Sequence, residues 1–167
     1  MFRNLIGFPL LALVVILQSA VISQITLLSG YADLVLVVLA AWALHVESAS
    51  AWQWAILCGA MVSFVSKVPW PVTFAGYLFV VFLAQMLRHR VWQAPILAMF
   101  SVVFLGSLSI DVLALVVLNA LGVPLPFGDS LGLIILPSIL LNLLLSIPIY
   151  AMIRDLARWV APRSEVE

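Results

Sequence analysis

The chain carries one acidic residue, Asp111, deep inside a long apolar run between Pro95 and Leu121. A carboxylate at that depth costs at least about 2.5 kcal/mol in a bilayer unless it is protonated, hydrogen-bonded or paired. Ser107 precedes it by four residues on the same helix face, and Asn119 follows on roughly that face. No basic residue lies equally deep. Three roles are open for Asp111: a hydrogen-bonded structural group, a contact for a partner helix, or part of a proton or ligand path.

A second set of polar side chains, Ser138, Asn142 and Ser146, recurs every four residues in the last apolar run. This spacing places all three close to one face of a helix. A lipid-facing helix gains nothing from such a face, so we expect it to pack on protein. It would either stitch the bundle together or form a groove for another protein's helix. Gln18 and Asn119 have the same two interpretations.

Sequence signals of catalysis are nearly absent. The chain has no G-x-S-x-G, H-E-x-x-H, Walker or CxxC motif. The two histidines, His45 and His89, lie far apart beside charged residues at the ends of apolar runs, as interfacial side chains do. Cys58, the single cysteine, has no metal ligands nearby in the sequence and is interpreted as a packing residue. We therefore expect no enzyme, no metal site and no cofactor.

The composition is that of an integral membrane protein. Hydrophobic residues make up 66% of the 167 positions and charged residues only 8%, whereas soluble domains carry about 25% charged residues. The mean hydropathy is +1.29. Seven basic and seven acidic residues cancel. The balance gives no basic face for nucleic acid, and the chain cannot cover itself with polar surface in water.

Six apolar runs, separated by polar or proline-containing turns, predict an all-α bundle of six membrane-spanning helices. The expected helices cover, in chain order, 5–28, 34–46, 52–65, 72–87, 95–121 and 131–152. The second and third are short for a bilayer about 30 Å thick, but a single helix over 31–66 would be about 54 Å long. The basic start and the first run also resemble a secretion signal, but no cleavage site follows Ser19-Ala20, which favours a spanning helix. We expect one transmembrane domain over 1–157 and a polar cytoplasmic tail over 158–167.

The charged residues fall unevenly on the two sides of such a bundle. An even number of spans puts six of the seven basic residues on the side of both termini: Arg3, Arg88, Arg90, Arg154, Arg158 and Arg163. The other side then holds Lys67, Asp33 and Asp129. By the positive-inside rule, both termini are expected in the cytoplasm.

Four short stretches carry a resemblance to a known family. They are Leu17-Gln18-Ser19, Ala32-Asp33-Leu34, Gly76-Tyr77-Leu78 and Leu136-Pro137-Ser138-Ile139-Leu140-Leu141-Asn142. With these stretches in this order, the chain resembles the rod shape-determining protein family MreD over nearly its whole length. It departs from the family at Ala32, where a proline is common, and over 63–69, which lacks the family's acidic residue and its Ser-Gly-rich turn.

The resemblance implies a protein of the bacterial plasma (inner) membrane without enzymatic activity, which acts in cell-wall elongation and cell shape. Its implied direct partner is MreC, a single-span protein with an extracytoplasmic coiled coil. The wider assembly would include MreB, the RodA glycosyltransferase and its cognate penicillin-binding protein. The resemblance also implies a six-helix fold similar to the substrate-binding subunits of energy-coupling-factor vitamin transporters.

The sequence and the resemblance therefore leave two functions open. The first is a membrane scaffold that binds partner helices, with partner contacts expected at Gln18, Asp111, Asn119, Ser138, Asn142 and Ser146. The alternative is a small-molecule, vitamin-type substrate-binding subunit of a membrane transporter, in which Asp111, Asn119, Gln18 and Asn142 would converge on a cavity.

Overall fold

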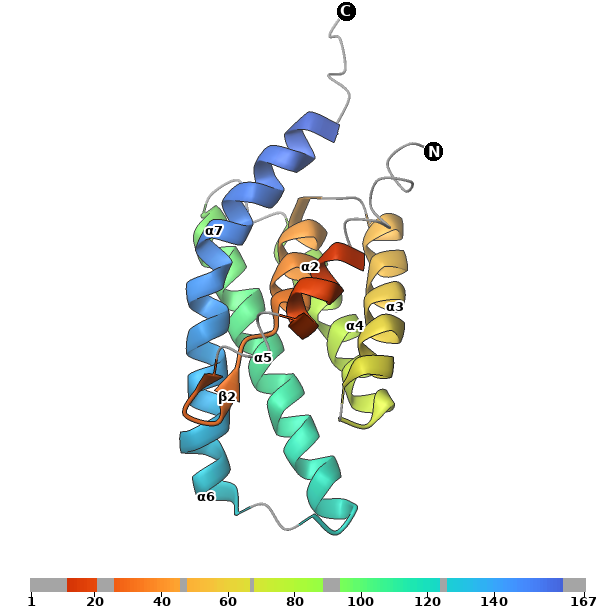
Figure 1. The fold of residues 1–167 in the computed structure, drawn as a ribbon. Coiled ribbons are helices and arrows are strands. Elements are labelled where there is room, and N and C mark those ends of the chain that lie inside the picture. The colour runs from red at the N-terminus through yellow and green to blue at the C-terminus, as the bar shows by residue number, and fades with distance from the viewer. Residues whose placement is uncertain are drawn as a thin grey trace, which may run out of the picture.

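The computed structural model describes residues 12–20, 26–45, 48–66, 68–88, 94–123 and 126–160, and within them the chain forms a helical bundle with one small β-hairpin (Figure 1). A helix covers 12–20. It is followed by α2 (Leu34–His45), α3 (Ser48–Val65), α4 (Trp70–Leu87) and α5 (Pro95–Ala120). The last helix is continuous and consists of α6 (Phe127–Ser130), the π-helical turn η3 (Leu131–Ile135) and α7 (Leu136–Val160).

Within the described residues, three helical stretches are long and apolar enough to cross a membrane, namely α4, α5 and Phe127–Leu156. The mainly helical fold expected from the sequence is thus confirmed, and these three stretches fit the expected membrane protein. Among the shorter apolar helices, α2 has only 12 residues and rises about 18 Å, roughly half of a bilayer core. Alone, α2 cannot cross a membrane.

The sequence placed two helix ends incorrectly. Helix was expected through residue 28, but Thr26–Leu27 form strand β1, which pairs antiparallel with β2 (Gly30–Tyr31). The last helix was expected to end at residue 152, yet α7 continues to Val160 and so runs through the expected domain boundary at 157. Residues 5–11 of the first expected helix and 161–167 of the expected tail lie outside the described residues.

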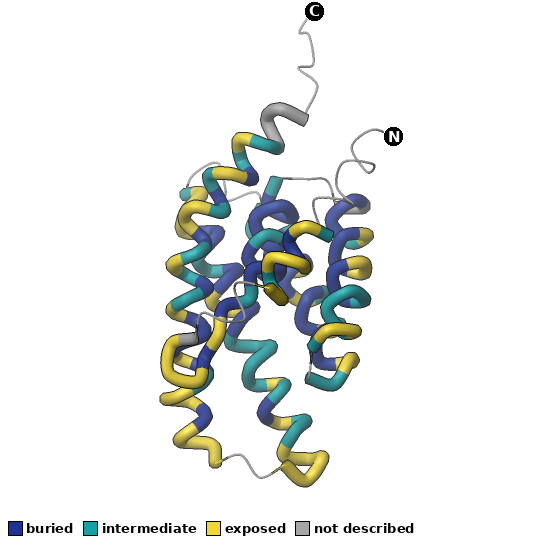
Figure 2. Tube along the Cα trace, viewed as in Figure 1, coloured by how far each residue is buried: buried dark blue, intermediate teal, exposed yellow. Residues whose placement is uncertain are grey.

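One cluster of buried apolar residues fills the bundle around α2, α4 and α5 (Figure 2). We call it the dry core, and its members include Val37, Ala40, Val80, Val81 and Val102. Small residues let the helices approach closely there. A Cβ on Gly106 of α5 would lie 2.6 Å from a methyl group of Val80 on α4. Likewise, Gly59 of α3 faces the ring of Phe74 on α4, where a Cβ would lie 2.8 Å from a ring carbon. Such close approach is how helices gain packing energy in lipid.

The β-hairpin docks on the last helix at a defect in that helix's own hydrogen bonding. Pro137 has no N–H to donate to the Leu133 carbonyl four residues earlier. The Ser29 N–H donates to that carbonyl instead, at 3.0 Å. The neighbouring Gly30 fits closely, because a Cβ there would lie 2.6 Å from the Ile134 carbonyl oxygen and 2.7 Å from the Ser138 nitrogen. As a result, the chain enters α2 part-way along the bundle, beside the middle of α5 and α7 (Figure 1).

Candidate functional site

Asp33 lies directly before α2 and caps its amino terminus. Its Oδ1 accepts a hydrogen bond from the Leu36 N–H at 2.9 Å, which satisfies one of the free N–H groups of the first turn. The Tyr77 hydroxyl, on α4, lies 3.1 Å from Oδ1 and 2.9 Å from Oδ2 and donates to the carboxylate. The positive end of the α2 dipole and the phenol together stabilise a negative charge at Asp33.

Gln18 satisfies the extended backbone beside Asp33. Its Nε2 donates to the Ala32 carbonyl at 2.8 Å, and its Oε1 accepts from the Leu34 N–H at 2.6 Å. Non-helical backbone inside an apolar bundle needs such partners, because no lipid group can provide them. The Gln18 amide therefore holds the helix 12–20 against the start of α2.

Asn142 joins three elements. Its Oδ1 accepts from the Asp33 N–H at 2.7 Å, and its Nδ2 donates to the Ser107 hydroxyl of α5 at 2.8 Å. One turn earlier on α7, the Ser138 hydroxyl lies 2.6 Å from Asp111 Oδ2 and 3.0 Å from the Ile135 carbonyl. The last helix is thus tied to both the entry of α2 and the middle of α5.

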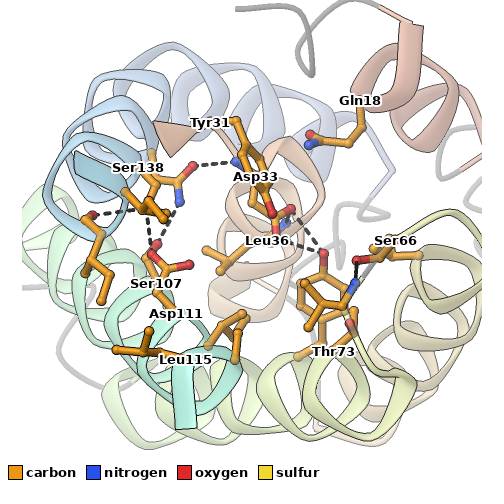
Figure 3. A pocket seen from close by; sticks show the side chains of 18 of the residues that line it. Gln18, Tyr31, Asp33, Leu36, Ser66, Thr73, Ser107, Asp111, Leu115 and Ser138 are labelled. Atoms are coloured by element: carbon orange, nitrogen blue, oxygen red, sulfur yellow. Dashed lines mark hydrogen bonds between the residues drawn. The ribbon is translucent and has the colours of Figure 1, made fainter. Parts of the chain in front are cut away.

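A cavity of about 530 Å³ lies at the amino-terminal end of α2, within the size range of small-molecule sites. It exists because α2 starts part-way along the bundle and leaves the space beyond its first residue unfilled. The polar part of its wall includes Gln18, Tyr31, Asp33, Tyr77, Asp111 and Asn142, which come from separate elements of the bundle (Figure 3). The rest of the wall is mostly apolar.

Of the six side chains singled out from the sequence, Gln18, Asp111, Ser138 and Asn142 all line this cavity. Ser146 is fully buried on α7, and its hydroxyl donates to the Leu143 carbonyl at 2.6 Å. The expectation that the polar face of the last helix packs on protein is confirmed, since Ser138, Asn142 and Ser146 are all buried. Between the two uses considered for that face, the hydrogen bonds show internal stitching.

Asn119 is not part of the cavity wall. It is exposed near the end of α5, and its amide donates to the Leu115 carbonyl at 3.0 Å. Eight residues of helix separate it from Asp111, which turns it by about 80° away from that side chain. Asn119 therefore does not lie on the helix face of Ser107 and Asp111, where the sequence interpretation had placed it.

The sequence interpretation missed Asp33 as a site residue. Asp33 was expected on the membrane surface with Lys67 and Asp129, and that position was wrong, because its partners Tyr77 and Asn142 lie inside the bundle. Asp111 is consequently not the sole deep carboxylate. The available signal was the shortness of the second apolar run, which cannot span a bilayer by itself and so starts within it.

Within the described ranges, no three residues of the types His, Cys, Asp and Glu come together as a metal site. Cys58 is a free, buried thiol. The His45 ring contacts Tyr150, with 5.1 Å between ring centroids. His89 lies outside the described residues. The arrangement around Asp33 and Asp111 is a hydrogen-bonded network beside a cavity.

No protein-family model, curated protein or solved structure matches the chain.

Proposed function

We propose that this protein is a non-enzymatic membrane scaffold of the bacterial cell-wall elongation machinery, of the MreD type, which binds MreC and links it to peptidoglycan synthases. One observation carries the proposal. The four stretches on which the resemblance rests meet in one network, to which they contribute Gln18, Asp33, Tyr77 and Asn142. Leucine-rich helices resemble one another by chance, and the meeting of the four stretches in one network gives the resemblance a support that the single stretches lack.

The network supports a scaffold by fixing the shape of the bundle. The bond from the Asp33 N–H to Asn142 joins residues 109 positions apart, and Asn142 continues to Ser107 on α5. Buried polar networks that are fully paired hold their members in one arrangement. In the proposed mechanism, the rigid bundle packs against the spanning helix of MreC and so positions its outer domain beside RodA and the penicillin-binding protein, with MreB in the same assembly.

The proposal includes a plasma-membrane protein with six helical segments in the membrane and both termini in the cytoplasm. The placement of basic residues, with Arg88 and Arg154 both expected on the side of the two termini, supports this orientation. A reporter that is active only when it folds in the cytoplasm should therefore be active when it is fused after Glu167. Activity of a reporter that works only outside the cytoplasm, fused at the same position, would contradict the topology.

Co-purification tests the scaffold directly. Tagged protein, extracted in mild detergent, should retain MreC, and Asn142→Ala should lower the retained MreC several-fold because it leaves the Asp33 N–H and Ser107 without their partner. Asn119→Ala is the matched control, since that side chain is exposed near the end of α5 and does not line the cavity. If the unaltered protein retains no MreC, the function is wrong. If Asn142→Ala retains it fully, only the role of the network is wrong.

The cavity favours a second candidate, a substrate-binding subunit of a small-molecule transporter. Its volume of about 530 Å³ and its convergent polar groups are those of a ligand site. Mass spectrometry of small molecules released from purified protein separates the two candidates. A stoichiometric metabolite together with no retained MreC would favour the transporter subunit.

A further inference from the structure

The two carboxylates in the cavity wall are held differently. Asp33 has the Tyr77 hydroxyl against both oxygens and the Leu36 N–H on Oδ1, at the positive end of α2. Among the described residues, Asp111 has a single hydrogen-bond donor, the Ser138 hydroxyl on Oδ2. Asp111 Oδ1 accepts no hydrogen bond from the described residues, and it is not one of the fully buried polar atoms without a partner. The oxygen is therefore exposed, and it faces the cavity that Asp111 lines. Asp111 is therefore the carboxylate with capacity for a ligand.

The described part of the cavity wall supplies no positive charge. Its polar members are hydroxyls, amides and the two carboxylates, and none of the described lining residues is Lys, Arg or His. An unneutralised carboxylate is costly in an apolar surrounding. A ligand that brings its own cation to Asp111 would remove that cost and gain a charge-assisted hydrogen bond.

Apart from the hydroxyls, amides and carboxylates, the wall is apolar, and this apolar part determines which ligand body fits. Ile110, Ala114 and Leu118 come from α5, Val62 from α3 and Ile134 from η3. These side chains offer dispersion contacts and no hydrogen bonds. The occupant that fits such a wall is apolar apart from the group that reaches Asp111.

We propose that this cavity binds a compact molecule with one protonated amine and an apolar body, with the amine donating to Asp111 Oδ1. The inference stands apart from the scaffold function, because ligand binding and retention of MreC are separate measurements. It names a ligand class for the space inside the cavity, to which the scaffold mechanism assigns no occupant.

Equilibrium dialysis of the full chain in lipid nanodiscs tests the proposal, with empty nanodiscs as the blank for partition into lipid. The probes are butylamine, phenethylamine and tryptamine, each beside the alcohol with the same carbon body. At least one amine should bind saturably and at least about tenfold more tightly than its alcohol, as expected for a hydrogen bond to a charged group. If no amine binds better than its alcohol, the proposal is overturned.

Three variants locate the binding. Asp111→Asn should weaken amine binding at least about tenfold, and Ala114→Phe, which keeps the carboxylate but fills the cavity, should abolish it. Asp129→Asn removes an exposed carboxylate that does not line the cavity and should leave binding unchanged. Equal binding by Asp111→Asn and the unaltered chain would overturn the assignment. If Asp111→Asn fails to fold, Ala114→Phe decides in its place.

Lys67 follows the lining residue Ser66 and lies outside the described residues, so the test also includes Lys67→Met. Amine binding that is as strong in the unaltered chain as in Lys67→Met supports the proposal. Amine binding seen only in Lys67→Met would show that this lysine already neutralises Asp111, and would overturn it.

Discussion

The two halves of the bundle are packed differently, and the difference follows from where α2 begins. Beside α2, the dry core is closed, with Val37, Ala40, Val80 and Val81 fully buried. Beyond its amino terminus, only a small separate cluster remains, made of Leu115, Ile135 and Ile139, and the cavity takes up the adjoining space. Figure 2 shows the same contrast, with buried residues concentrated in the half that contains α2.

The contrast shows how an apolar chain builds a polar site. Where α2 runs beside α3, α4, α5 and α7, mostly small and branched residues fill the interior. Where α2 stops, the backbone over 29–34 is extended or turning and needs partners for its N–H and C=O groups. Gln18, Asn142 and the Leu133 carbonyl provide them. The polar side chains therefore gather at the boundary between the two halves.

The docking of the hairpin should be the most sensitive point of this boundary. In Gly30→Ala, the new Cβ meets two backbone atoms that cannot rotate away, the Ile134 oxygen and the Ser138 nitrogen. We expect the free energy of unfolding, measured by SDS titration, to fall by about 3 kcal/mol, at the upper end of overpacking costs. Gly132→Ala is the matched control. Nothing lies within 4 Å of a Cβ there, so stability should stay equal or rise slightly. Equal losses in both variants would mean that the hairpin does not dock on the last helix.

Removing the Tyr77 hydroxyl should have a smaller effect. Tyr77→Phe deletes the only side-chain hydrogen bond that the described residues give to the Asp33 carboxylate, and we expect a loss of about 2 kcal/mol in unfolding free energy, as for hydrogen bonds to charged groups. Tyr31→Phe, at a half-exposed ring in the same cavity, should stay within about 0.5 kcal/mol. If Tyr31→Phe lost as much unfolding free energy as Tyr77→Phe, the bond from Tyr77 to Asp33 would have no special role in stability, and this prediction would be wrong.

The Ser138 hydroxyl should contribute least. Ser138→Ala removes one donor from Asp111, and interhelical hydrogen bonds in membranes average about 0.6 kcal/mol. Ser101→Ala, whose hydroxyl bonds to the Leu97 carbonyl of its own helix, is the control and should change stability by less. A loss above about 2 kcal/mol in Ser138→Ala would mean that the Asp111 carboxylate depends on this donor and is not free for a ligand.

Much of the bundle could be predicted from the sequence, because each apolar run is a local signal. The ends of α3, α4 and α5 lie within a few residues of the predicted ones. The inward face of α7 was likewise readable from the spacing of Ser138, Asn142 and Ser146. The depth of Asp111 in a long run singled this residue out, but it left three roles open for it.

The position of Asp33 could not be read in this way. A polar break such as Ser29-Gly30-Tyr31 looks the same in sequence whether it turns at the membrane surface or inside the bundle. The position of this break is determined by the last helix, about a hundred residues later in the chain. There, Pro137 leaves the Leu133 carbonyl without its helical donor, and Ser29 donates to it while Gly30 fits closely beside it. These are long-range pairings, which hydropathy and periodicity do not report. For the same reason, the shortness of the second apolar run was the one sequence signal of the cavity beyond α2.

Thiol accessibility tests the contrast between the two halves most directly. Cys58 is the only cysteine and is buried, so a Cys58→Ala background carries no other thiol. In nanodiscs, a water-soluble cationic thiol reagent should label Ala114→Cys, on the cavity wall, readily. It should not label Ala84→Cys, which is fully buried in the dry core. If the thiol at position 114 were as unreactive as the thiol at position 84, there would be no open cavity beyond α2, and the two halves of the bundle would be packed alike.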